Sequence, residues 1–232
     1  RDAALEFETE IDGVMVNAEL AREEAAPGSD IAQLMDQIKN AVAPVTHLAG
    51  ELLAFSTPGA LKIRRLELGK CVLGVRRILD EAAGSQIELV LEVAAEGVPV
   101  MVDPDRIEQA IVHLVVNAVE AIPERGRVTL RVAPVDLSEE QRARLQAGVP
   151  ERHRHRGRFG LLSVQDTGCG MSEATLNQIF EPFFTTKARR DAGLGLTTVY
   201  NIVLQHNGLI DVQSRPGEGT LFSVYLPLAE GE

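Results

Sequence analysis

The chain has 232 residues, 45% of them hydrophobic and 25% charged, a composition that suits one large or two small globular domains. A formal net charge of −11 argues against a nucleic-acid partner, and no apolar run is long enough for a membrane-spanning helix. Cys71 and Cys169 stand far apart without a C-x-x-C pattern, so we expect no disulfide framework and no zinc site, which fits the reducing cytoplasm. Because the apolar runs are short and the N-terminus lacks the pattern of a signal peptide, we expect a soluble chain without membrane contact.

The N-terminal residues predict two amphipathic helices, because apolar residues recur at spacings of three and four and so form one stripe along each helix. The first stripe consists of Phe7, Ile11, Val14 and Ala18. The second stripe consists of Ile31, Leu34, Ile38, Val42, Val45, Leu48, Leu52 and Phe55. Between them lies a turn, after which Ser29 or Asp30 can cap the second helix. Because a two-helix hairpin cannot bury both stripes by itself, we expect two copies to pair as a four-helix bundle in a homodimer.

The Thr57-Pro58-Gly59 sequence interrupts the helical periodicity and predicts a domain boundary. We assign residues 1–57 to the helical hairpin, 58–66 to a linker and 67–232 to a second domain.

The second domain contains six segments with strand patterns and four with helical patterns, in no regular alternation. The predicted strands are Gln86–Ala94, Val98–Val102, Arg127–Pro134, Phe159–Gln165, Leu209–Ser214 and Thr220–Pro227. The predicted helices are Cys71–Ala83, Pro104–Ile122, Glu173–Ile179 and Leu196–Gln205. This mixture predicts an α+β fold, an α/β sandwich, and the polar residues 138–158 predict an insertion between two strands.

Three segments of the second domain point to a ligand. Asp166 is followed by Gly168 and Gly170, which let backbone approach a ligand closely, although such a turn is common. The Gly193-Leu194-Gly195-Leu196 sequence opens a helical pattern, and a helix N-terminus offers free N–H groups to phosphate. Asn117 lies on an amphipathic helix and needs a partner there, which a structural hydrogen bond would supply as well as a ligand. Each signal is weak alone.

In their order along the chain, these segments resemble the catalytic domain of sensor histidine kinases, which has the GHKL, or Bergerat, type of nucleotide-binding fold. The segments similar to the family's N, G1, F and G2 boxes and its terminal hairpin are His113–Ala121, Asp166–Met171, Ile179–Lys187, Gly193–Leu196 and Gly217–Phe222. Five matches in the family's order argue against chance. In the hairpin, Glu51–Ser56 is similar to the end of the dimerisation domain in the nitrogen-regulator and hybrid-kinase subgroup.

The resemblance implies a site for ATP and Mg²⁺. Asp166 would accept a hydrogen bond from the adenine amino group, with the Thr220 hydroxyl beside it. Asn117 would coordinate Mg²⁺ through its amide oxygen, and Glu120 would hold a metal-bound water or face solvent. The other implied ATP-binding positions are Gly168, Gly170, Lys187, Gly193, Leu194, Gly195 and Leu196. Lys187 and the glycines at 193 and 195 would surround the phosphates as part of a lid.

Two positions near this site differ from the usual family pattern. His113 stands where most of these kinases have Asn or Glu, although the chemotaxis kinases also have histidine. Its imidazole would act as a catalytic proton acceptor or phosphate contact, or it is a buried structural histidine. The G2 box lacks its usual first glycine, because Asp191 and Ala192 precede Gly193. The phenylalanines Phe180, Phe183 and Phe184 are expected to anchor the lid.

The largest departure is at the phosphoacceptor position. In this subgroup a histidine stands twelve residues before an Asn-Ala-Glu-Leu sequence, which matches residues 17–20, and counting back gives Leu5. Leucine has no nucleophilic nitrogen, so we expect no autophosphorylation there. We interpret His47, in the second helix, as a surface residue rather than as a substitute acceptor.

This pattern fits two functions. The first is a histidine protein kinase of a two-component system, which passes the γ-phosphoryl of ATP to a histidine on another chain or on a partner. The expected partners are a response regulator or another histidine kinase. The second is a pseudokinase, a nucleotide-binding regulatory dimer without phosphotransfer, which the loss of the acceptor favours. The gyrase, mismatch-repair and chaperone ATPases share the nucleotide fold, but they need a Glu base at the position of His113 and further domains.

Overall fold

The computed structural model describes residues 17–18, 20–22, 25, 29–35, 37–38, 61–147, 157–186 and 193–229. The chain divides into two compact units. The hairpin unit contains Arg1–Ala60 and Thr185–Leu194, and the sheet unit contains Leu61–Phe184 and Gly195–Glu232.

In the hairpin unit, the described residues are helical at 17–18 and 20–22 and again at 30–35 and 37–38. Ser29 caps the second helix: its Oγ accepts a hydrogen bond from the Ala32 N–H at 3.3 Å, as the sequence predicts. Ile31, Leu34 and Ile38 of the predicted second stripe are 58%, 53% and 37% exposed. The second stripe therefore stays at the surface of a single chain over the residues that the structure describes.

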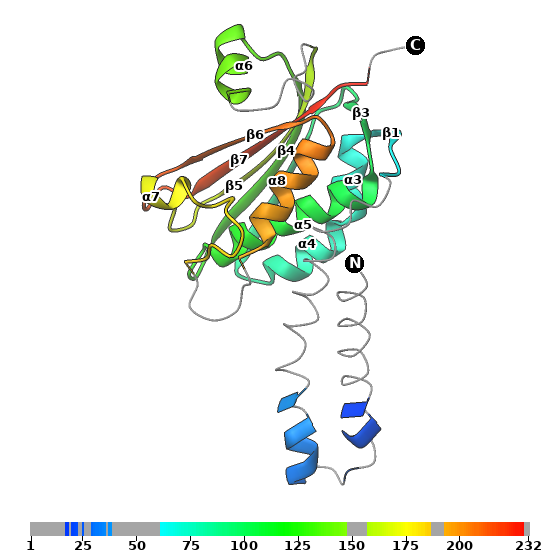
Figure 1. Ribbon diagram of the computed structural model, residues 1–232, viewed down its shortest axis with the longest axis vertical. Helices are drawn as coiled ribbons and strands as arrows, with labels where there is room; N and C mark the ends of the chain where they lie inside the picture. Colours follow the sequence, from blue (N-terminus) through cyan, green and yellow to red (C-terminus); the bar gives the residue numbers. More distant parts are fainter. Residues whose placement is uncertain are drawn as a thin grey trace. The chain divides into compact units, whose positions relative to one another are not determined.

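The sheet unit is built on a mixed five-stranded sheet in the order β2-β4-β5-β7-β6 (Figure 1). Its strands are β2 (Ile87–Val93), β4 (Gly126–Val135), β5 (Phe159–Asp166), β6 (Leu209–Ser214) and β7 (Thr220–Pro227). Only β2 and β4 pair in parallel. A separate two-stranded sheet consists of β1 (Arg64–Glu67) and β3 (Pro99–Val102), which pair antiparallel.

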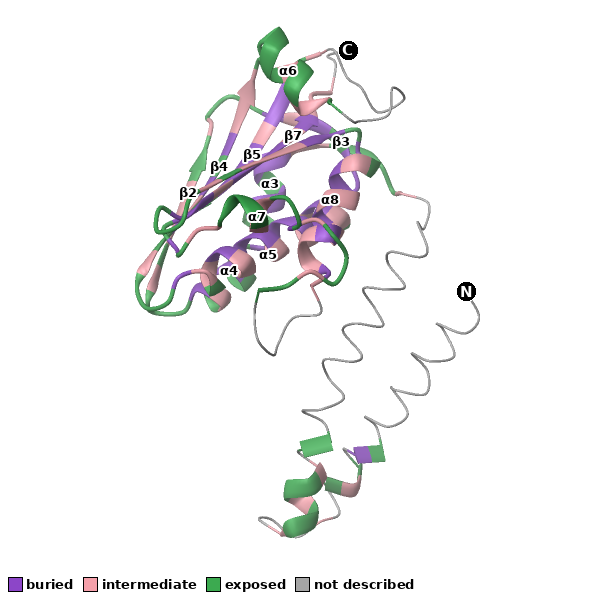
Figure 2. Cartoon of the chain, turned by 60° about the vertical axis from the view of Figure 1, so that its left-hand side comes forward, coloured by how far each residue is buried: buried purple, intermediate pink, exposed green. Residues whose placement is uncertain are grey.

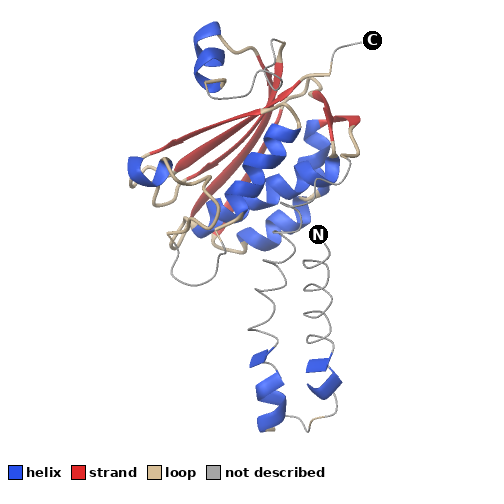
Figure 3. Cartoon of the chain, in the orientation of Figure 1, coloured by secondary structure: helices blue, strands red, loops and turns tan. Residues whose placement is uncertain are grey.

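Most helices of this unit lie on one face of the five-stranded sheet (Figure 3). The helices of this unit are α3 (Leu68–Gly74), α4 (Arg76–Ala83), α5 (Pro104–Glu120), α6 (Glu139–Leu145), α7 (Glu173–Leu176) and α8 (Gly195–Gln205). Asp103 caps α5 by accepting from the Asp105 N–H, and Pro104 occupies the first turn, where its missing N–H costs nothing. The long helix α5 packs centrally and places its apolar face on the sheet.

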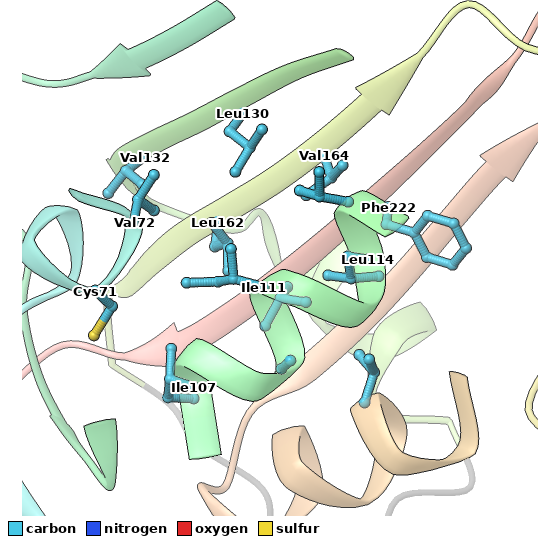
Figure 4. Close-up of a cluster of buried hydrophobic side chains, with 14 of the residues drawn as sticks. Cys71, Val72, Ile107, Ile111, Leu114, Leu130, Val132, Leu162, Val164 and Phe222 are labelled. Atoms are coloured by element: carbon cyan, nitrogen blue, oxygen red, sulfur yellow. The ribbon is translucent and has the colours of Figure 1, made fainter. Parts of the chain in front are cut away.

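The main core lies between α5 and the sheet (Figure 4). Ile107, Ile111 and Leu114 point from α5 toward Leu130, Leu162 and other sheet residues. All five are at most 1% exposed. Figure 2 shows the same pattern as buried residues concentrated where helices face strands. Because burial of one such side chain contributes about 1.5–3 kcal/mol, this contact fixes α5 firmly on the sheet.

The α+β sandwich and all six predicted strands are confirmed, and β6 and β7 have the predicted bounds. The predicted helix 71–83 is wrong as a single element. Its two halves, α3 and α4, are separated at Val75, whose φ of −95° and ψ of 3° end the first helix after Gly74. Strand β1 begins within the residues expected to be linker, because β3 offers it an antiparallel partner.

The insertion 138–158 also contains structure that the polar composition does not predict. Ser138 and Gln141 form a capping box that starts α6. Leu145 then packs with Phe159 and Tyr225, on the sheet face opposite α5. An ion pair of 3.0 Å between Arg144 and Asp211 joins α6 to β6. The insertion therefore begins as an attached helix, while residues 148–156 lie outside the described part.

Candidate functional site

Asp166 lies at the end of β5, next to the first residue of β7. It is 3% exposed. Its Oδ1 accepts hydrogen bonds from the Gly168 N–H at 2.7 Å and from the Thr220 N–H at 3.2 Å. Burial raises the pKa of the Asp166 carboxyl, and the two N–H donors act in the opposite direction. Within the described residues, Oδ2 receives no hydrogen bond, so this oxygen is available to a ligand.

The glycines around Asp166 allow close approach of protein backbone. Gly170 and Gly219 have φ values of +64° and +79°, in the left-handed region. A Cβ on Gly170 would collide with the Arg215 carbonyl oxygen, and a Cβ on Gly219 would collide with that of Asp166. The motif alone suggests that the G1-box glycines serve ligand approach. In the structure, the fold itself already requires glycine at position 170, because the backbones of two loops of the protein meet there.

These loops are also joined by hydrogen bonds. The Gly217 N–H donates to the Cys169 carbonyl at 2.7 Å, and the Cys169 N–H donates to the Ala121 carbonyl at 2.9 Å. The end of α5, the G1 segment and the turn before β7 therefore form one connected structure around Asp166.

His113 and Asn117 lie one turn apart on α5 and both are partly buried. Gly195, the first residue of α8, faces them: a Cβ there would lie 3.4 Å from Nδ1 of His113 and 3.8 Å from Nδ2 of Asn117. The N-box and G2-box positions, far apart in sequence, are thus adjacent in the structure. Glu120 is exposed, and each of these three residues has an interaction within the protein.

The lid region is described only in part. Lys187, Asp191 and Ala192 lie outside the described residues. Gly193 has a φ of +68°, a conformation that favours glycine, and Leu194 is 4% exposed. Leu196 packs against the main core.

The three phenylalanines of the F box have different environments. The Phe180 ring lies 5.1 Å from the Tyr200 ring, and its carbonyl accepts from the Thr197 hydroxyl at 3.2 Å, so it is fixed to α8. Phe184 packs against the main core. Phe183 is 60% exposed with a φ of +66°. Because residues 187–192 of the lid lie outside the described part, the anchoring role of these three phenylalanines stays a prediction.

A buried polar cluster at the other end of α5 and α8 was not predicted. His206 is 4% exposed, and its Nε2 accepts from the Asp103 N–H at 3.0 Å. Its Nδ1 lies 2.7 Å from the Ile202 carbonyl, which can only accept, so Nδ1 bears the proton. Asp103 also accepts from the Lys62 N–H at 2.8 Å. This cluster ties the start of the sheet unit to both helices that carry site residues.

Comparison with known proteins identifies the family of the sheet unit. The family model described as histidine kinase-, DNA gyrase B- and HSP90-like ATPase matches residues 102–230. The chain therefore belongs to this ATPase family.

Within the family, curated proteins similar to this chain include sensor histidine kinases. Sensor kinase CckA of Brucella abortus (strain 2308) is 36% identical over 181 residues, which cover 78% of this chain and 18% of that protein. Sensor histidine kinase ZraS of Escherichia coli (strain K12) is 32% identical over 207 residues, 89% of this chain and 40% of that protein. The chain thus spans less than half the length of these relatives.

Solved structures show the same fold. Full-length ShkA in complex with AMPPNP has a TM-score of 0.79 at 22% identity, over 99% of this chain and 45% of that chain. The catalytic domain of histidine kinase ThkA has a TM-score of 0.52 at 24% identity, over 72% of this chain and 96% of that chain. Among the described residues, no helix is both long and apolar enough to cross a membrane.

Proposed function

We propose that this chain binds ATP with Mg²⁺ and passes the γ-phosphoryl group to a histidine of another protein in a two-component system. The observation that carries this proposal is Asp166, a buried carboxylate that holds one oxygen on two backbone N–H groups and leaves the other without a protein donor in the described residues. Such a carboxylate suits a ligand amino group, because a charge-assisted hydrogen bond is about twice as strong as a neutral one.

The phosphate end of the nucleotide would lie where α5 meets α8. Gly195 opens an 11-residue helix whose first N–H groups have no partners within the helix, and backbone there suits phosphate oxygens. Gly193, Leu194, Leu196 and Lys187 would complete the phosphate contacts. The side chains of His113 and Asn117 border this helix start.

The residues present fit a Mg²⁺ ion that takes only a few of its ligands from the protein. Among the described residues, no group of three or more His, Cys, Asp or Glu could hold a metal. Asn117 offers a hard amide oxygen next to the proposed phosphate position, and Mg²⁺ in such sites takes its remaining ligands from phosphates and waters. When bound, Mg²⁺ would neutralise phosphate charge; Glu120 would hold one of its waters, and His113 would accept a proton or contact phosphate.

We place the acceptor on another chain because Leu5 stands at the acceptor position expected from the sequence. In-line phosphoryl transfer depends chiefly on positioning and charge neutralisation, so the site can act without its own acceptor. A homodimer through the hairpin is supported by the exposed Ile31, Leu34 and Ile38. Another histidine kinase or a response regulator is the proposed partner, in the cytoplasm.

The leucine at position 5 also favours a second function, a nucleotide-binding regulatory dimer without phosphotransfer. One experiment distinguishes the two. The chain is incubated with γ-labelled ATP and Mg²⁺, alone and with a histidine kinase that keeps its acceptor histidine but has an inactivated nucleotide site. We expect label on the second protein, and none when Asn117→Ala replaces the wild-type chain. ATP binding without label on either protein would favour the regulatory dimer.

A further inference from the structure

Three polar side chains lie in a row at one end of the sheet. Asp166 of β5, Thr220 of β7 and Ser214 of β6 occupy neighbouring strands, and Ser214 pairs directly with Thr220 in the antiparallel register. Side chains at paired positions lie on the same face of a sheet. All three therefore lie on the face that α5 covers, where the proposed nucleotide would be held.

Ser214 is the most highly connected of the three. Its Oγ lies 2.8 Å from the Met171 N–H nitrogen, 2.9 Å from the Gly219 carbonyl oxygen and 2.9 Å from the Thr220 Oγ1. A hydroxyl has one proton to donate and two lone pairs to accept with. Three partners at these distances use the whole capacity of the Ser214 hydroxyl.

The chemistry of the partners fixes the direction of each hydrogen bond. The Gly219 carbonyl can only accept, and within the described residues Ser214 is its one hydrogen-bond donor. The Ser214 proton therefore points to Gly219, because an unpaired buried carbonyl is costly. The Met171 N–H can only donate. The contact between the two hydroxyls must then use the proton of Thr220.

This direction decides what Thr220 can offer a ligand. With its proton given to Ser214, the Thr220 hydroxyl has only lone pairs left and acts as an acceptor. The neighbouring Asp166 carboxylate also only accepts. Both side chains would therefore receive hydrogen bonds from a base that presents an amino group, and neither would donate to a carbonyl oxygen in its place.

We propose that Ser214 is a specificity-determining positioning residue, which holds the Thr220 hydroxyl as an acceptor and so favours a purine with an amino group at C6 over one with a carbonyl group. This inference rests on the proposed nucleotide site and assigns one cause of its base preference. Ser214 would act through Thr220, without touching the nucleotide.

The test compares the affinities of ATP and inosine triphosphate, which differ at C6, where an amino group is replaced by a carbonyl group, and at N1, which carries a hydrogen only in inosine. Calorimetric titration of the whole chain would give the ratio of the two dissociation constants. In Ser214→Ala the Thr220 proton becomes free to donate, so the preference for ATP should fall by about threefold to tenfold, the value of one neutral hydrogen bond. Ser214→Thr keeps a hydroxyl and should restore the ratio. Ser223→Ala, a buried serine on the opposite face, should leave it unchanged.

A merely structural role for Ser214 would weaken both nucleotides equally, and an unchanged ratio would overturn the proposal. If Ser214→Ala does not fold, Thr220→Val provides an independent test, which is the change in the ratio of the two nucleotide affinities. Loss of an acceptor should weaken ATP more than inosine triphosphate, whereas loss of a donor would do the reverse and contradict the inference. A wild-type chain that binds neither nucleotide would instead reject the proposed function.

Discussion

The backbone of Gly219 passes so close to the Asp166 carbonyl oxygen that a Cβ on Gly219 would collide with it. Any larger residue would push β7 away from the end of β5, and Thr220 follows directly on the chain. The hydrogen bond from the Thr220 N–H to Asp166 Oδ1 thus depends on a glycine at position 219.

Gly219→Ala should therefore destabilise the fold strongly. Gly217→Ala is the matched control, because Gly217 has a similar φ of +80° but a Cβ added there would meet no atom within 4 Å. We expect a loss of about 1–2 kcal/mol in the free energy of unfolding for Gly217→Ala, from the left-handed backbone alone. Gly219→Ala adds overpacking and should lose about 2–5 kcal/mol. Urea unfolding measures both, and equal losses would contradict the close contact.

Asp166→Asn should separate binding from stability. The amide keeps an oxygen for the N–H groups of Gly168 and Thr220, and it removes a charge whose burial raises the carboxyl pKa. We expect an unchanged or slightly higher melting temperature, with ATP affinity reduced by about tenfold or more through loss of the charged acceptor. Asp105→Asn, at an exposed position, is the control. Unchanged ATP affinity in Asp166→Asn would remove Asp166 from the site.

His206 should make stability depend on pH. Burial lowers its pKa from 6.5; the Ile202 carbonyl and Asp103 oppose this, and Arg106 adds to it. The folded chain keeps His206 neutral, whereas the unfolded chain takes up a proton below its ordinary pKa of 6.5. This contribution is therefore complete above that pH and is lost as the pH falls below it.

The measurement is the free energy of unfolding between about pH 7 and about pH 5, with a slope of at most about 1.4 kcal/mol per pH unit from one residue. His206→Gln should flatten this slope, and His113→Gln should keep the His206 contribution. Burial acts to raise the pKa of Asp103, but backbone N–H groups outweigh it and hold this pKa below its ordinary 3.8. The stability that Asp103 contributes is therefore complete between about pH 7 and about pH 5 and adds no slope there. Identical slopes in wild type and His206→Gln would show that His206 is not the responsible group.

Leu5→His tests whether the missing acceptor is the main barrier to autophosphorylation. If the nucleotide site is competent, the variant should incorporate label from γ-labelled ATP on its own chain or on its dimer partner, because imidazole supplies the nucleophilic nitrogen that leucine lacks. The double variant with Asn117→Ala should stay unlabelled. A Leu5→His chain that binds ATP but takes up no label would place the defect elsewhere, such as in the substituted Glu8-Thr9 pair.

The sequence predicts most of the fold where the signals are local. The alternation of apolar and polar residues predicts the bounds of β6 and β7. The Asp103-Pro104 sequence marks the first residue of α5. Strand β1 has four residues and no clear pattern, so only its pairing with β3 makes it a strand. The break at Val75 lies inside a continuous helical pattern, and therefore local signals do not reveal it.

In the candidate site too, some residues can be predicted from local sequence and others depend on tertiary contacts. Asp166, Asn117 and Gly195 are found from motifs, because their residue types and order are properties of the sequence. Ser214 has a weaker signal: two adjacent predicted strands with a short turn place it opposite Thr220, but its three hydrogen bonds depend on the Met171 and Gly219 backbones.

The sequence by itself determined the family, the order of the motifs and the absence of a histidine at position 5, since these depend only on which residues follow one another. The tertiary structure decided that His113 faces Gly195 and that His206, not a motif residue, is the buried neutral histidine. Hydrogen bonds and contacts between distant segments form only when the chain is packed, and their directions follow from which groups then have a proton to give.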